Sequence, residues 1–142
     1  MRMERAETNL RQIVHRAARW YPTRDAVVDL VQRLTYSELQ DQVWRMAALL
    51  HSLGVRKGDR VALLMHPSVA HVTALFGTIE LGAIPCALHL RESPELLQAV
   101  TERLSPRVLV YDAALDDLAA ELRRRVPLIT GAVRAASAVA TP

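Results

Sequence analysis

The sequence predicts an α/β fold in which a mostly parallel sheet is flanked by helices on both faces. Three short, continuous apolar runs are typical of buried parallel strands: Val61–Met65, Ile84–Leu88 and Val108–Tyr111. Segments with helical spacing separate these runs, and each is long enough to form the crossover that parallel strands require. We therefore expect the three runs to be neighbouring strands of one sheet.

The residues before these strands predict a helix and a small hairpin. Apolar side chains recur at helical spacing over Asn9–Tyr21, and Pro22 follows directly. Two brief apolar segments, Ala26–Leu30 and Arg33–Thr35, flank Val31-Gln32, which is the pattern of a hairpin.

Capping residues mark the helix boundaries. Thr35 and Glu38 form a capping box, in which each side chain satisfies a backbone N–H that the start of a helix leaves free. Gly54 and Gly82 stand where helices end and a left-handed residue is expected. The later predicted helices are Val69–Leu81 after Ser68, Pro94–Leu104 after Ser93, and about Ala114–Arg125 after Asp112.

The C-terminal residues indicate where the folded unit is expected to end. Val126–Ile129 is short and apolar, and Pro127 restricts it to an edge strand. Residues 131–142 are mostly small and Ala-rich, so we expect a flexible tail after an α/β unit that covers residues 1–130.

Composition excludes several classes of protein. The chain has 142 residues, of which 51% are hydrophobic and 23% charged, as in an ordinary globular domain. Its net charge is +3, but basic residues are interspersed with acids and aromatics make up only 4%, which argues against nucleic-acid binding. The sequence shows neither a transmembrane run nor a signal peptide, so we expect a cytoplasmic protein. Oligomer formation is left open.

Reactive groups are sparse. The loop after the first parallel strand, His66-Pro67-Ser68, contains no glycine to cradle a phosphate, and Ser68 is better explained as a helix cap than as a nucleophile. Lys57 lies between Gly54 and Gly58, but this turn precedes a strand and is explained by a helix stop.

Metal and thiol chemistry are not expected either. His66, His71 and His89 lack the spacing of a metal site, so we predict no metal ligands. The lone Cys86, in an apolar stretch, is interpreted as a small core residue.

The order of segments resembles the N-terminal region of adenylate-forming (AMP-binding) enzymes, in particular the acyl-CoA synthetases, and is similar to that of fatty-acid–CoA ligases. The resemblance covers roughly residues 8–130. It rests on these segments: Tyr21-Pro22, Asp25-Ala26-Val27, Leu34–Leu39, Gly54–Met65, Leu75–Ala83, Pro94-Glu95-Leu96 and Val108–Asp112.

The resemblance implies that the complete enzyme joins a carboxylic acid to the thiol of CoA through an acyl-adenylate, with ATP and Mg²⁺. The absence of a clear set of polar recognition residues favours a fatty or other apolar acid. His66-Pro67-Ser68 stands where such enzymes often have Pro-Asn-Ser, and Arg91 matches a commonly seen arginine. His66 and Arg91 are therefore the candidate substrate-binding residues. The family's ATP loop, Mg-binding acid and C-terminal lysine have no counterpart in this chain, so we expect no catalytic or cofactor-binding residue here.

The leading hypothesis is an N-terminal fragment that supplies scaffold and one wall of the acyl pocket and is inactive alone. Acyl-AMP ligases and the adenylation domains of peptide synthetases begin with a similar sequence pattern and are close alternatives. A stand-alone, non-catalytic binding module derived from the family is the alternative of a different class. A small flavodoxin-like or receiver-like domain also has this order of elements, and Asp112 fits the acidic strand end of a receiver.

Overall fold

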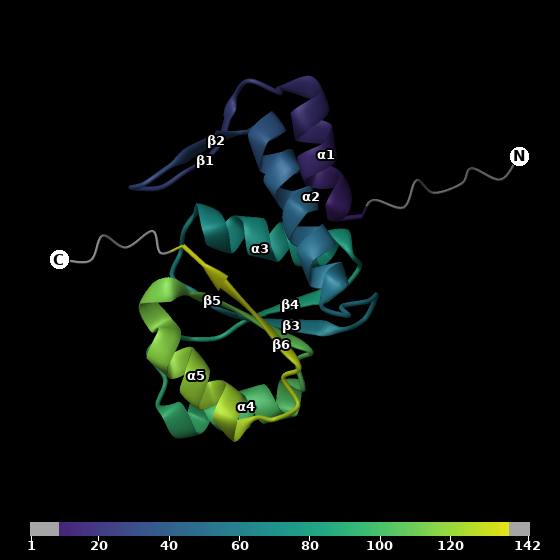
Figure 1. The fold of residues 1–142 in the computed structure, drawn as a ribbon. Coiled ribbons are helices and arrows are strands. Elements are labelled where there is room, and N and C mark those ends of the chain that lie inside the picture. The colour runs from purple at the N-terminus through teal and green to yellow at the C-terminus, as the bar shows by residue number, and fades with distance from the viewer. Residues whose placement is uncertain (1–8, 137–142) are drawn as a thin grey trace, which may run out of the picture.

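The computed structural model describes residues 9–136 and contains a four-stranded parallel sheet between two layers of helices (Figure 1). The strand order is β4-β3-β5-β6, and every neighbouring pair is parallel. The strands span β3 (Arg60–Leu64), β4 (Ile84–Ala87), β5 (Val108–Asp112) and β6 (Gly131–Ala135). The predicted fold class, with three neighbouring parallel strands, is confirmed.

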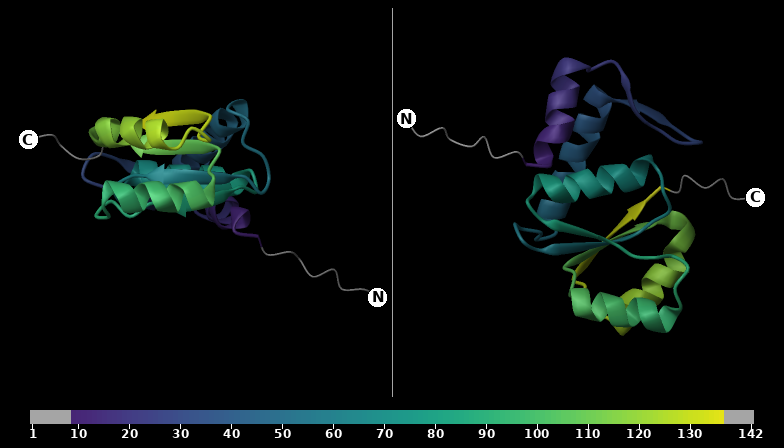
Figure 2. Two further views of the ribbon diagram at one scale, coloured as in Figure 1. Left: turned by 90° about the horizontal axis from the view of Figure 1, so that it is seen from below. Right: turned by 180° about the vertical axis from the view of Figure 1, so that it is seen from behind.

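The helices cover both faces of the sheet because its side chains alternate. Val61 and Leu63 point to one core, which they share with α2 (Tyr36–Ser52) and α3 (Val69–Glu80). Ala62 and Leu64 point to the other core, beneath α4 (Pro94–Leu104) and α5 (Asp116–Arg125). Figure 2 shows these layers from below and from behind.

The N-terminal elements form an outer layer. Helix α1 (Arg11–Trp20) packs on α2, and β1 (Asp25–Val28) pairs antiparallel with β2 (Arg33–Thr35). The predicted hairpin is thus confirmed, although its first strand starts and ends earlier than expected. In the described part of the chain no helix combines the length and apolarity needed to cross a membrane.

The predicted helix caps are largely as expected. The Thr35, Ser68 and Ser93 hydroxyl oxygens each accept a backbone N–H at the start of a helix, at 3.2, 3.1 and 3.2 Å. Gly54 and Gly82 have φ of +92° and +69°. One detail differs: the Glu38 carboxylate accepts the Thr35 hydroxyl proton at 2.9 Å rather than the Thr35 backbone N–H.

The predicted C-terminal boundary is wrong in the described residues. Gly131–Ala135, expected to be loose, forms β6 and pairs with β5 along its whole length. Val126–Ile129, expected to be the last strand, is instead a turn that buries Val126 and Ile129 under α5. Small side chains suit β6 because it packs closely: Gly131 faces Val108 and Leu53. The rest of the predicted tail, residues 137–142, lies outside the described residues.

A carboxylate in the hairpin ties the outer layer to the sheet unit. Asp29 accepts backbone N–H groups of Val31 and Gln32 at 2.8 Å and, forty residues away, that of Val69 at 2.9 Å. These backbone hydrogen bonds, led by the one from Val69, lower the pKa of Asp29. Asp29 thus anchors the hairpin at the N-terminus of α3.

We predict that this anchor stabilises the fold only while Asp29 is ionised. Because its folded-state pKa is lowered, the contribution is complete above the unfolded pKa of about 4 and is lost as the pH falls through the lower folded value. Urea unfolding of the parent chain and of Asp29→Asn at pH 6 and pH 3 checks this. The advantage of the parent over Asp29→Asn should be smaller at pH 3 than at pH 6, whereas a pH-independent difference would contradict the prediction.

Candidate functional site

The carboxyl edge of the sheet is the place where this topology forms a crevice. From β3 the chain crosses to β4 on one side and later returns to β5 on the other side, so the crossovers diverge between β3 and β5. Ligands of open α/β sheets bind at such a switch point, beyond the carboxyl ends of the strands. The residues that follow β3 and β5 are therefore the first candidates for function.

Two side chains meet at this point. His66 follows β3 and Asp112 ends β5, and His66 Nδ1 lies 2.9 Å from Asp112 Oδ2. The same oxygen accepts the backbone N–H of His66 at 2.6 Å. Asp112 is 1% exposed, whereas the His66 side chain is 38% exposed. The structure thus brings a sequence candidate, His66, into contact with a buried carboxylate.

Arg91, the other sequence candidate, lies elsewhere along the same edge. It follows β4, the neighbour of β3, in an exposed loop where its backbone N–H donates to His89 Nδ1 at 3.3 Å. No hydrogen bond or ion pair joins Arg91 to His66. The two candidates therefore occupy adjacent loops without touching.

An apolar hollow of about 200 Å³ opens beside the loop that carries His66. Its lining begins at Pro67, the residue after His66, and continues along α3 through Val72, Leu75 and Phe76, with Ser68 and His71. The Ser68 hydroxyl is nearly buried and caps α3, as predicted, so this hydroxyl adds little hydrogen-bonding capacity to the hollow. The carboxyl edge thus combines polar groups with a nearby apolar surface.

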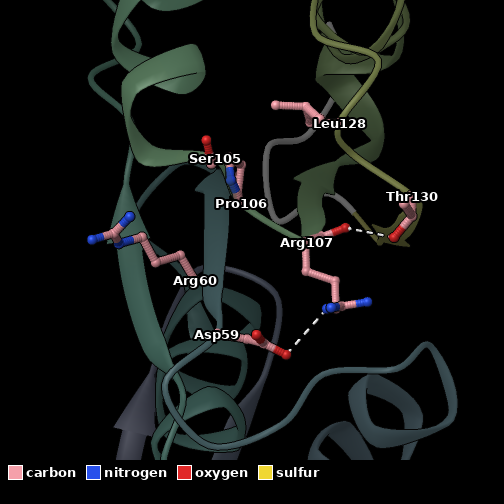
Figure 3. A pocket seen from close by; sticks show the side chains of 7 residues that line it. All are labelled: Asp59, Arg60, Ser105, Pro106, Arg107, Leu128 and Thr130. Carbon is pink, nitrogen blue, oxygen red and sulfur yellow. Dashed lines mark hydrogen bonds and ion pairs between the residues drawn. The ribbon is translucent and has the colours of Figure 1, made fainter.

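A second hollow, of about 320 Å³, lies at the opposite, amino edge of the sheet (Figure 3). Its polar groups bind one another: Arg107 Nε lies 3.1 Å from Asp59 Oδ2, and the Thr130 hydroxyl donates to the Arg107 carbonyl. The Arg60 guanidinium points away from this pair and donates to the Leu104 carbonyl. These contacts join the starts of β3 and β5, so we assign the hollow a structural role.

The glycine-flanked turn at Lys57 also has a structural role. Gly58 has φ of +84°, its N–H donates to the Gly82 carbonyl at 3.0 Å, and Asp59 accepts the Arg56 N–H at 2.8 Å. The turn leads into β3 at the amino edge. The sequence interpretation of this segment as a helix stop and turn is consistent with these contacts.

Two further sequence interpretations concern the lone cysteine and the absence of metal ligands. Cys86 is half-buried rather than a full core residue, and burial raises the pKa of its thiol. The described residues hold no group of three or more His, Cys, Asp or Glu side chains arranged for a metal.

One ion pair at the carboxyl edge was not found from the sequence. Arg134 in β6 binds both Asp116 oxygens, at 2.8 and 2.9 Å, and holds the pKa of that carboxyl below its ordinary value. No local pattern marks a pair separated by 18 residues, and the sequence prediction had left β6 out of the sheet.

Comparison with known proteins gives the family. The model of the family described as AMP-binding enzyme matches residues 14–140. The long-chain-fatty-acid–CoA ligase of Thermus thermophilus is 31% identical over 121 residues, which cover 82% of this chain and 22% of the ligase. The hybrid PKS-NRPS synthetase apdA of Emericella nidulans is 32% identical over 102 residues, 72% of this chain and 3% of that protein.

A solved structure agrees with these relatives. The fatty acyl CoA synthetase of Mycobacterium tuberculosis superposes with a TM-score of 0.83 at 26% identity, over 89% of this chain and 26% of the synthetase. This chain therefore spans about a quarter or less of each of these three proteins. Because the family model covers most of its length, the chain belongs to the AMP-binding enzyme family.

Proposed function

We propose that this chain is the N-terminal α/β part of an ATP-dependent acid–thiol ligase, that it contributes scaffold and one wall of the acid-binding pocket, and that it does not catalyse adenylation alone. The observation that carries the proposal is the carboxyl edge at the switch point, where His66 and Arg91 follow adjacent strands beside an apolar hollow. The Arg91 guanidinium can donate hydrogen bonds to a carboxylate, and the His66 imidazole adds a polar ring next to the hollow.

The apolar hollow favours an acyl chain over an amino acid as the substrate of the complete enzyme. An amino acid carries an ammonium group that needs an acidic partner, and no acid lines this hollow. Pro67, Val72, Leu75 and Phe76 instead offer apolar contact. This supports a CoA ligase for fatty or other apolar acids rather than an adenylation domain of a peptide synthetase. The cytoplasm is the compartment that we propose for this ligase.

The described residues do not fit an ATP site. The loops after β3, β4 and β5 contain no glycine, so no backbone cradle for phosphates forms at the carboxyl edge. The positive-φ glycines Gly54, Gly58 and Gly82 all lie in turns that lead into strands, at the amino edge. ATP, Mg²⁺ and CoA would therefore be held by other parts of the complete enzyme.

We predict that a carboxylate perturbs the carboxyl edge specifically. In ¹H–¹⁵N spectra of the 142-residue chain, millimolar octanoate should shift Arg91, because its guanidinium can donate to the oxygens of the carboxylate. 1-Octanol, which has the same chain length but no carboxylate, is the matched control and should move only residues of the hollow, such as Val72. Equal shifts with both compounds, or octanoate shifts confined to the amino edge around Arg107, would contradict the proposed site.

A further inference from the structure

We propose that Asp112 is a positioning residue: its buried carboxylate holds the His66 imidazole with hydrogen on Nδ1, so that Nε2 carries no hydrogen and faces the crevice as a hydrogen-bond acceptor for an O–H or N–H group of the ligand. The contact of Nε2 with a ligand rests on the carboxyl-edge site proposed above. The orientation of the ring does not.

The hydrogen-bonding capacity of the pair determines the tautomer. An ionised carboxylate accepts hydrogen bonds and donates none, so the 2.9 Å contact requires hydrogen on His66 Nδ1. When one ring nitrogen is bound in this way, the other is left for a ligand. Because Nδ1 faces a carboxylate that is 1% exposed, the exposed part of the His66 ring is the opposite edge, which carries Nε2.

In the described part of the structure, the Asp112 carboxylate forms hydrogen bonds with His66 and with no other residue. Oδ2 receives both of its hydrogen bonds from His66, from the backbone N–H and from Nδ1, while Oδ1 is buried without a partner. A buried, half-satisfied carboxylate is costly, and such a group in a native protein calls for an explanation beyond packing. Orientation of the one functional candidate beside it provides that explanation.

The family pattern differs from this sequence at the position of His66. His66 stands where similar enzymes often have proline. Proline has neither a backbone N–H nor a ring nitrogen available for hydrogen bonding, so it would leave Asp112 without both of the bonds seen here. The pair therefore adds a nitrogen to the crevice in place of an apolar ring.

The tautomer can be measured on the chain as it exists. With ¹⁵N-histidine labelling, long-range ¹H–¹⁵N correlation at pH 8 reports which ring nitrogen carries hydrogen, and loss of one signal in His66→Gln assigns His66. We expect His66 to carry its hydrogen on Nδ1. His71, whose ring forms no hydrogen bond among residues 9–136, is the internal reference and should show the Nε2–H form that free histidine favours.

Asp112→Asn separates positioning from structure. The amide can donate to Nδ1, as amide replacements do in catalytic triads, so the ratio of the two His66 tautomers should change at least about threefold toward Nε2–H. Asp112→Glu should retain the Nδ1–H form. Because Nε2–H can donate to a carboxylate and Nε2 without hydrogen cannot, the octanoate shift at His66 should be larger in Asp112→Asn than in the parent chain, while the shift at Arg91 is unchanged.

The outcomes are distinguishable even if a variant fails to fold. A His66 that carries hydrogen on Nε2 in the parent chain overturns the proposal, and so does an unchanged tautomer ratio in a folded Asp112→Asn. An Nδ1–H tautomer in the parent, with an octanoate shift at His66 that does not grow in Asp112→Asn, overturns the role of Nε2 in the crevice while it confirms the orienting role of Asp112; an unshifted Arg91 overturns the site proposed above.

Discussion

Gly77→Val is expected to destabilise the chain by about 3 kcal/mol, the upper end of the usual cost of overpacking a core. Helices α2 and α3 cross at Gly77, where a Cβ would lie 2.5 Å from Met46 Cγ and 2.8 Å from Met46 Cβ. Those atoms are close to the α2 backbone and cannot swing away. The free energy of unfolding in urea, compared with the parent chain, measures the effect.

Two further variants make this expectation specific to the helix crossing. In an open helix position Gly→Ala adds stability of about 1 kcal/mol, but Gly77→Ala should reduce stability because of the Met46 contact. Met46→Ala removes Cγ, so it should recover part of the stability that Gly77→Ala loses. In a double-mutant cycle of the two substitutions, this recovery should appear as a favourable coupling energy of about 1 kcal/mol. A stabilising Gly77→Ala, or zero coupling, would show that the helices do not approach closely at Gly77.

Ending the chain at Thr130 is expected to remove most of its stability. This deletion takes away β6, which buries Val133 and pairs with β5 from Val108 to Asp112. Burial of one valine contributes about 1.5–3 kcal/mol and each ladder hydrogen bond about 0.5–1.5 kcal/mol, against a total of about 5–15 kcal/mol for a typical domain.

A chain ending at Ala136 is the matched control, because it keeps β6 and removes only residues that the structure does not describe. It should unfold like the full chain. Thermal unfolding followed by circular dichroism compares the three. Equal stability of the chain ending at Thr130 would restore the sequence interpretation of residues 131–142 as a tail and contradict the position of β6.

The sequence predicted the inner part of the sheet well because its signals are local. Continuous apolar runs mark β3, β4 and β5, and serine caps and positive-φ glycines mark the helix ends. Strand β6 was missed because Gly131-Ala132-Val133 has small side chains and no apolar run, and its place depends on the edge of β5. Long-range packing, here against Val108 and Leu53, overrides weak local propensity.

The candidate site was predictable only in part. His66 was singled out as a departure from a family pattern, but its partner Asp112 lies 46 residues away and becomes a neighbour only when β3 and β5 pair. The same holds for Asp29 and Val69, which are joined across 40 residues. Contacts between strand ends follow from topology and register, which spacing along the chain does not contain.

The central claim is that this family member supplies scaffold and an acid-binding wall but not the adenylation chemistry. The most direct test of this claim is the carboxylate-dependent exchange of labelled pyrophosphate into ATP. That chemistry needs cations and positioned donors against the phosphates, and Lys57, the one lysine of the chain, lies in the amino-edge turn against Gly82. With acetate, octanoate or palmitate, exchange should stay at the no-enzyme background, and ATP should not raise the melting temperature. Exchange above background that disappears in Lys57→Ala would contradict the claim.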